Sequence, residues 1–198
     1  MKLRTRLFLA AFGVAGLTLV FAGVLVAWSL QEQLLSRIEA DLVAETQLVG
    51  ELVERLDENS TLLSLDTEAD TLGRQLGARV TFIAPSGQVV GDSAEDGASL
   101  YSMENHRNRP EVEIAADEGF AVTRRYSTTV EADLIYVALR VDHSDVSFVR
   151  LALPLTEVDE QLASIRNATI FGLLIALAGA LVFAWFSSIA MTRRVQSI

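Results

Sequence analysis

The sequence of 198 residues contains no cysteine, three prolines and two histidines. The absence of cysteine excludes disulfide bonds, thiolate metal sites and redox sensing through a disulfide. The sequence also lacks the glycine-rich phosphate loop, the paired-histidine zinc motif and the serine nucleophile motif that mark common classes of enzyme. We therefore expect no catalytic centre, no metal site and no cofactor in this chain.

Charge is missing from two long stretches. Residues 7–30 (LFLAAFGVAGLTLVFAGVLVAWSL) and 168–191 (ATIFGLLIALAGALVFAWFSSIAM) contain no charged side chain. A helix needs about 20 apolar residues to cross the hydrocarbon core of a bilayer. We therefore expect two transmembrane helices, with residues 1–30 forming a short cytoplasmic N-terminus and the first of them, and residues 168–191 forming the second.

The charged residues are distributed unevenly around these stretches. All 26 acidic residues and 11 of the 16 basic ones lie between residues 31 and 167, which gives this segment a net charge of −15, whereas both termini are basic. Positively charged flanks of membrane helices stay in the cytoplasm. We expect a two-pass protein of the bacterial inner membrane, with both termini cytoplasmic and residues 31–167 forming an extracytoplasmic domain. The acidity of this domain argues against nucleic acid as a partner.

Periodicity predicts four helices and five strands within the domain. An apolar stripe over residues 31–57 continues from the first membrane helix, and indicates either a dimer seam or a helix packed on the sheet of its own domain. A second helix is expected over 66–76, with Asp66 as its N-cap and Gly77 at its end. A short helix should run from Arg109 to Gly119. The predicted strands are 79–84, 88–91, 120–128, 134–141 and 146–153.

The connections between these strands determine the expected fold class. The turn Pro85-Ser86-Gly87 joins the first two strands, and residues 142–145 join the last two. Hairpin connections imply an antiparallel sheet, with helices on one face, and hence an α+β fold. Residues 92–108 are expected to be irregular. A final helix over 155–167 should lead into the second membrane segment.

Candidate ligand-binding residues lie in and near the long segment 92–108. His106 stands in the stretch MENHRNRPE beside Glu104 and Arg109. This cluster indicates either a ligand contact or pH-sensitive switch, or a polar network that pins a long loop to the sheet. Asp92 ends the second strand, where it would either cap the chain or bind Arg109.

A second group of candidates lies on the strand 120–128. Arg125 and Tyr126 are adjacent, so strand alternation places their side chains on opposite faces. If Arg125 points under the helices, it could hold an anionic ligand such as a carboxylate. The candidate ligand-binding residues are therefore Asp92, Glu104, His106, Arg109, Arg125 and Tyr126.

Four stretches carry a resemblance to a known family. They are LGRQLGARVTFIAPSGQVVGDS at 72–93, MENHRNRPEV at 103–112, LIYVALRV at 134–141 and VRLALPL at 149–155. Together they resemble the extracytoplasmic PAS-like sensor of membrane histidine kinases, in particular those of the phosphate-regulon type. The resemblance implies a PAS-like five-stranded sheet, flanked by helices and inserted between two transmembrane helices, in a homodimer.

The resemblance extends to the residues after the second membrane helix. Residues 192–198 are similar to the start of a HAMP relay, although the usual proline after the basic pair is absent. In such receptors the relay leads to a kinase, so we expect this chain to be part of a longer protein. ATP, magnesium and a cognate response regulator are implied only for that kinase part.

The sequence thus predicts the sensory and transmembrane portion of a two-component sensor histidine kinase, which relays an extracytoplasmic stimulus by helix movement. Two alternatives remain. The output could instead be a cyclic-dinucleotide enzyme or a chemotaxis-type signaller, or the chain could be a two-helix membrane protein that acts only by binding a partner.

Overall fold

The computed structural model describes residues 3–56, 61–95, 97–127, 131–156, 167–179 and 182. A compact domain extends from Leu35 to Glu157, and the apolar segments on either side of it form a second unit. The predicted final helix over 155–167 falls almost entirely outside the described residues, and the predicted relay at 192–198 does so completely.

The first helix is long and continuous. Helix α1 (Leu3–Val53) has 51 residues and extends from the first apolar stretch into the domain. Its portion Gly13–Val53 contains an 18-residue window with a mean hydropathy of 2.0, and the helix is long and apolar enough to cross a membrane. A second apolar helix, Asn167–Gly179, is shorter, and most of the remainder of the predicted segment 168–191 lies outside the described residues.

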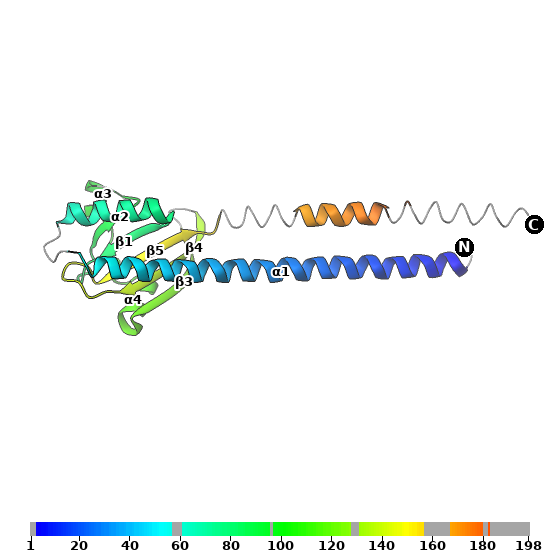
Figure 1. Cartoon of the computed structure of the whole chain (residues 1–198), viewed down its shortest axis with the longest axis horizontal. Coiled ribbons are helices and arrows are strands. Elements are labelled where there is room, and N and C mark those ends of the chain that lie inside the picture. The colour runs from blue at the N-terminus through cyan, green and yellow to red at the C-terminus, as the bar shows by residue number, and fades with distance from the viewer. Residues whose placement is uncertain are drawn as a thin grey trace, which may run out of the picture. The chain divides into compact units, whose positions relative to one another are not determined.

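The domain contains an antiparallel sheet of five strands (Figure 1). Its order is β2-β1-β5-β4-β3, and each neighbouring pair is antiparallel. The strands are β1 (Arg79–Ile83), β2 (Val89–Asp92), β3 (Phe120–Ser127), β4 (Ala132–Arg140) and β5 (Phe148–Pro154). This architecture confirms the predicted α+β, PAS-like fold.

Helices cover both faces of the sheet. Helices α1 and α2 (Leu62–Leu76) contribute to the main apolar core on one face, and α4 (Pro110–Glu118) packs on β3 and β4 from the other. The prediction of helices on one face only is therefore wrong. The burial of strands β4 and β5 gives the physical reason, since consecutive residues such as Ile135, Tyr136 and Val137 are all buried. Strands with burial on both sides need cover on both sides.

The apolar stripe of α1 packs mainly on its own domain. Leu42 and Val49 are buried in a core cluster with Phe82 and Leu151, whereas Leu52 is 47% exposed. Within the domain this apolar stripe therefore packs on the sheet of its own domain, which is one of the two predicted alternatives. The helix ends at Val53, a few residues before the predicted boundary.

Helix α2 begins earlier than the sequence suggested, and Asp66 is not its N-cap. The cap is Thr61, whose hydroxyl oxygen accepts a hydrogen bond from the Ser64 backbone N–H at 3.2 Å. Asp66 lies inside the helix, where its Oδ1 accepts from the Asp92 backbone N–H at 3.2 Å. Gly77 ends the helix in the left-handed conformation, as predicted.

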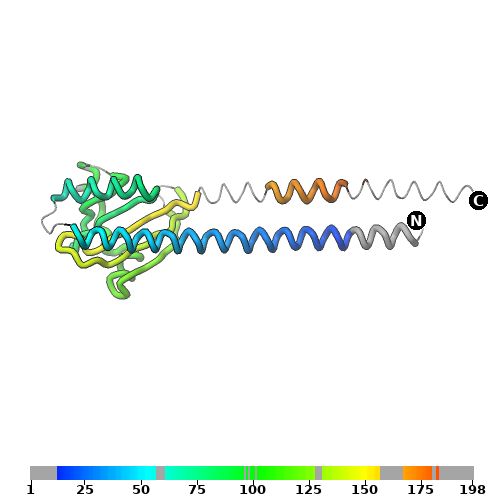
Figure 2. Tube along the Cα trace, viewed as in Figure 1, coloured from blue at the N-terminus to red at the C-terminus, as the bar shows by residue number. Residues whose placement is uncertain are grey.

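The segment between β2 and α4 is only partly irregular. It contains a five-residue helix, α3 (Ala98–Ser102), that the sequence did not indicate. The chain then continues through residues 103–109 into α4 along the β1–β2 hairpin (Figure 2). That hairpin turns at 85–87 as predicted, since the Gly87 N–H donates to the Ala84 carbonyl.

Candidate ligand site

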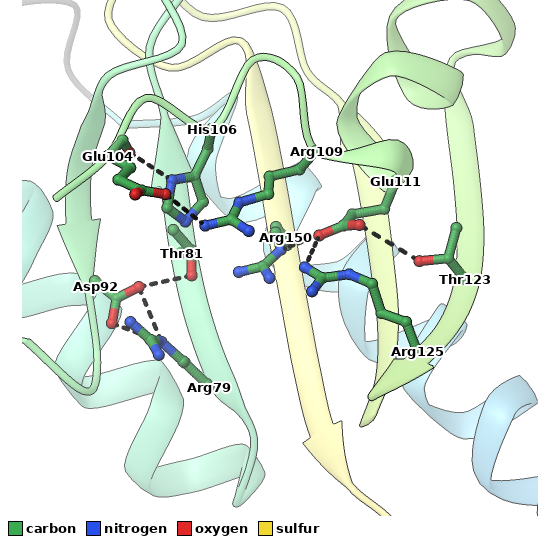
Figure 3. A network of polar contacts seen from close by, with 10 residues as sticks. All are labelled: Arg79, Thr81, Asp92, Glu104, His106, Arg109, Glu111, Thr123, Arg125 and Arg150. Carbon is green, nitrogen blue, oxygen red and sulfur yellow. Dashed lines mark hydrogen bonds and ion pairs between the residues drawn. The ribbon is translucent and has the colours of Figure 1, made fainter. Parts of the chain in front are cut away.

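A network of charged side chains lies between the sheet and the segment that contains α4 (Figure 3). The pleat of the strands explains its composition. Thr81 on β1 and Arg150 on β5 each lie between two residues of the α1–α2 core, so their side chains point the other way. Arg125 on β3 faces the same side, because its guanidinium group binds Glu111 of α4. The network thus occupies the sheet face opposite α1 and α2.

Glu111, in the first turn of α4, is the centre of one half of the network. Its side chain has no exposed surface. Its Oε1 accepts hydrogen bonds from Arg150 Nε at 2.8 Å and from Arg125 Nη2 at 3.2 Å. Its Oε2 accepts a longer bond of 3.5 Å from the Thr123 hydroxyl. One carboxylate therefore joins α4 to strands β3 and β5.

Tyr136 of β4 lies against both cations that bind Glu111. The guanidinium carbon of Arg125 is 4.1 Å from the centroid of its ring, and that of Arg150 is 4.5 Å from it. Guanidinium groups at such distances from an aromatic face gain a favourable cation–π interaction. The ring therefore supports the two cations where they meet the carboxylate.

The charges around Glu111 keep it ionised. Burial alone would raise the pKa of its carboxyl, but the charge of Arg150 and the hydrogen bond from Arg125 outweigh burial. The pKa of Glu111 therefore lies below its ordinary value of 4.5.

Asp92 is the centre of the other half of the network. Arg79 Nε donates to its two carboxylate oxygens at 2.9 and 3.1 Å, and the Thr81 hydroxyl donates at 2.7 Å. Its Oδ1 also accepts from the Ala94 backbone N–H at 3.0 Å, which forms a cap at the end of β2. The capping role was one predicted alternative for Asp92, but the arginine that binds it is Arg79 and not Arg109.

The motif around His106 pins the loop to the β1–β2 hairpin. His106 is 5% exposed, and its backbone N–H donates to the Gly87 carbonyl at 2.8 Å. Asn105 donates from Nδ2 to the Ser86 carbonyl at 2.9 Å. Gly87 has a φ of 85°, and a Cβ there would lie 2.6 Å from the Cβ of Arg107. The loop can approach the hairpin this closely only because residue 87 is glycine.

The His106 ring has a defined tautomer. Its Nδ1 lies 2.8 Å from the Glu104 backbone carbonyl, which can only accept, so Nδ1 carries the proton. Burial lowers the pKa of His106 below 6.5, and the positive charges of Arg150 and Arg109 lower it further. The ring is therefore mostly neutral at pH 7.

The pair formed by Glu104 and Arg109 lies at the outer margin of the network. Arg109 Nη2 is 3.4 Å from Glu104 Oε2, and the Glu104 side chain is 86% exposed. Exposed pairs of this kind contribute at most about 1 kcal/mol to stability. These two predicted site residues are therefore neighbours, but they do not form a buried site.

Strand alternation separates the last two predicted site residues. Arg125 points toward α4, as one of the predicted alternatives required, whereas Tyr126 lies on the opposite face and is 57% exposed. The aromatic residue beside Arg125 is Tyr136. The sequence reasoning did not select Glu111, Arg150 or Tyr136, although Arg150 is the one charge in the apolar strand FVRLALP.

The described residues hold no group of three or more acidic, histidine or cysteine side chains that could bind a metal ion. The site combines fixed cations, buried carboxylates and one aromatic ring. Such a set of groups suits the recognition of charged or polar molecules by ion pairs and hydrogen bonds.

No family model matches this sequence, and no curated protein matches it. Solved structures with a similar fold do exist. The ligand-binding domain of the amino-acid chemoreceptor PctC of Pseudomonas aeruginosa, in complex with GABA, superposes with a TM-score of 0.52 at 18% identity, covering 80% of this chain and 67% of that one.

Two further structures extend the comparison. The sensory domain of the Campylobacter jejuni chemoreceptor Tlp3 with isoleucine bound has a TM-score of 0.58 at 10% identity, covering 78% of this chain and 65% of that one. The sensor domain of the histidine kinase DctB of V. cholerae has a TM-score of 0.52 at 14% identity, covering 71% of this chain and 59% of that one. This chain thus spans about two thirds or less of these domains, and at such identities the likeness concerns the fold.

Proposed function

We propose that this chain is the sensory and transmembrane portion of a bacterial membrane receptor. The observation that carries the proposal is helix α1, which continues without a break from a membrane-length apolar stretch to residues buried in the core of a PAS-like domain. The likeness of the fold to sensor domains of chemoreceptors and of a histidine kinase supports it.

The proposed topology has two membrane passes. The apolar helix Asn167–Gly179 and the uncharged stretch 168–191 that contains most of it would form the second pass. The basic residues at both ends of the chain favour a cytoplasmic location for both termini. The acidic residues 31–167 would then lie outside the cytoplasm.

The proposed mechanism uses α1 as the moving part. The C-terminal part of this helix is fixed to the sheet by the buried side chains of Leu42, Val49 and Val53. A change in the domain would therefore shift or rotate the helix, and the apolar N-terminal part of the same helix would carry the displacement through the membrane. A stimulus can drive this change only if it interacts differently with the two states. In our proposal two copies of the chain act as a homodimer.

We favour a histidine kinase as the output. The stretches that resemble phosphate-regulon sensor kinases support this choice, and the sequence at 192–198 is similar to the start of a HAMP relay. ATP, magnesium and a response regulator would then act in the cytoplasmic part. A chemotaxis-type output is the second candidate, because domains of two chemoreceptors share the fold.

The gene downstream of codon 198 tests the proposal. We expect a relay, a phosphoacceptor helix pair and an ATP-binding domain, and the full-length product should label itself when it is incubated with radioactive ATP and magnesium. Replacing the phosphoacceptor histidine should abolish the label. A methyl-accepting signalling domain would instead establish the second candidate. A stop codon directly after Ile198 would contradict both.

A further inference from the structure

The single negative charge of the Glu111 carboxylate does not balance the two positive charges of its arginine partners. It brings one negative charge to two guanidinium groups, and the Arg150 side chain is only 6% exposed. In addition, the Nε atom of Arg125 is buried and has no hydrogen-bond partner among the described residues. A buried cation needs compensating partners. The two arginines therefore offer more positive charge and more hydrogen-bond donors than the single carboxylate of Glu111 satisfies.

The groups that bind this carboxylate all belong to the sheet. Arg125 and Thr123 are on β3, Arg150 is on β5, and Tyr136 is on β4 between them. Only Glu111 comes from a different element, α4 (Figure 3). If α4 moved away from the sheet, the cations and the ring would keep their places on three adjacent strands, while the carboxylate would leave.

We propose that Arg125, Arg150 and Tyr136 form a carboxylate-binding site on the sheet, which the chain fills with its own Glu111. A free small carboxylate binds there only when Glu111 withdraws. The exchange releases the first turn of α4 and the loop before it, which is the change that the sensory role requires. In this last respect the inference rests on the proposed function, whereas the binding site itself does not.

The alternative explanation is that Glu111 serves only to fasten α4 to the sheet. Helix α4 already has an apolar attachment, because Val112 and Ala115 are buried. A buried ion pair is a weak means of stabilisation, since the cost of desolvating its charges offsets much of the attraction. Two cations, an aromatic support and an unpartnered Nε exceed what a fastening needs, and they resemble the surroundings of a bound anion.

Chemical rescue of Glu111→Ala tests the proposal in the full chain of 198 residues in detergent micelles. The substitution removes the atoms of an acetate ion and leaves the two arginines in place. We expect the melting temperature to fall by on the order of 10 °C. Sodium acetate should then raise it by about 3–5 °C in a saturable manner, relative to sodium chloride at equal ionic strength.

Four controls make the rescue specific. Acetamide has the shape of acetate without its charge, and should give no rescue. Glu111→Ala combined with Arg125→Ala should lose most of the response to acetate. The wild-type chain should not respond, because its tethered carboxylate competes at a high effective concentration. Glu113→Ala removes an exposed carboxylate from the same turn, and should respond like the wild type.

If Glu111→Ala is recovered only as unfolded protein, Glu111→Gln decides the question, because it keeps the side-chain volume and removes the charge. Acetate should then raise the melting temperature of Glu111→Gln but not that of Glu113→Gln. Equal responses to acetate and chloride in every folded variant would overturn the proposal. Such a result would leave the sensory function intact, because self-labelling with ATP tests that function independently.

Discussion

At the scale of single residues, Glu111 and Asp92 are carboxylates whose side chains the fold removes completely from water. Each is matched by arginine, but in different ways. Among the described residues, Asp92 is bound by one arginine, Arg79, on the neighbouring strand β1. Glu111 connects a helix to two strands and faces two cations. The consequences of removing a charge should therefore be greatest at Glu111.

We expect Glu111→Gln to destabilise the domain by on the order of 3 kcal/mol, because it leaves two guanidinium groups beside a neutral amide in a buried site. Urea-induced unfolding followed by circular dichroism measures this effect. The matched control is Glu113→Gln, an exposed change in the same helical turn that should alter stability by no more than about 0.5 kcal/mol. Equal effects of the two substitutions would refute the assignment of Glu111 as the centre of the network.

The stability that Glu111 contributes should depend on pH. Arg150 from β5 and Arg125 from β3 lower its pKa in the folded state, and Tyr136 from β4 faces the same group of charges. The unfolded chain therefore binds a proton at a higher pH than the folded one does. The contribution is complete above the ordinary value of 4.5 and decreases as the pH falls toward the folded pKa. The stability gap between wild type and Glu111→Gln should be constant from pH 7 to about pH 5 and become smaller below that, whereas a constant gap would contradict the lowered pKa.

Some site residues could be predicted from the sequence, and others depend on tertiary contacts. Strand alternation was sufficient to place Arg125 and Tyr126 on opposite faces. It did not show that Arg125 and Arg150 share the Glu111 carboxylate, because 39 residues separate Arg150 from Glu111. Glu111 itself has the sequence appearance of an ordinary acidic residue in the first turn of a helix. Its burial follows only from the position of α4 on the sheet.

At the scale of elements, the five strands were predictable because each has either an alternating or a continuous apolar pattern between turn residues. The helices were harder to predict. A helix of five residues such as α3 is too short to show a period, and the start of α2 depends on a hydrogen bond made by Thr61. The helix that forms the second layer, α4, was itself predicted, but its position on the other face of the sheet was not, although continuous burial of β4 and β5 requires such a layer.

The hairpin turn at Gly87 offers a test of how the loop 103–109 is held. Gly87 and Gly119 have φ angles of 85° and 86°, but only Gly87 has neighbours where a Cβ would lie. Gly119→Ala should cost about 1–2 kcal/mol through backbone strain alone. Gly87→Ala should cost more, because its Cβ would overlap Asn105 and Arg107. Equal losses in urea unfolding would mean that the loop does not dock on this turn.

At the scale of the whole molecule, the distribution of charge matches the proposed location of each segment. The domain 31–167 carries a net charge of −15, and the five remaining basic residues lie outside it, close to the chain termini. An acidic domain remains soluble next to an anionic membrane surface, while basic termini stay in the cytoplasm. In the proposed topology, the long α1 connects these two environments in one continuous element.

Cysteine labelling tests the central claim, the extracytoplasmic location of the domain, most directly, because the native sequence has no cysteine of its own. Glu113→Cys would place a thiol on the exposed side of α4, and Thr5→Cys and Ser197→Cys would place one near each terminus. In intact spheroplasts, a membrane-impermeant maleimide should label the variant at residue 113 and label the other two only after permeabilisation. Protection of residue 113, or labelling of either terminal position in intact spheroplasts, would contradict the account of this chain as a membrane-anchored extracytoplasmic sensor.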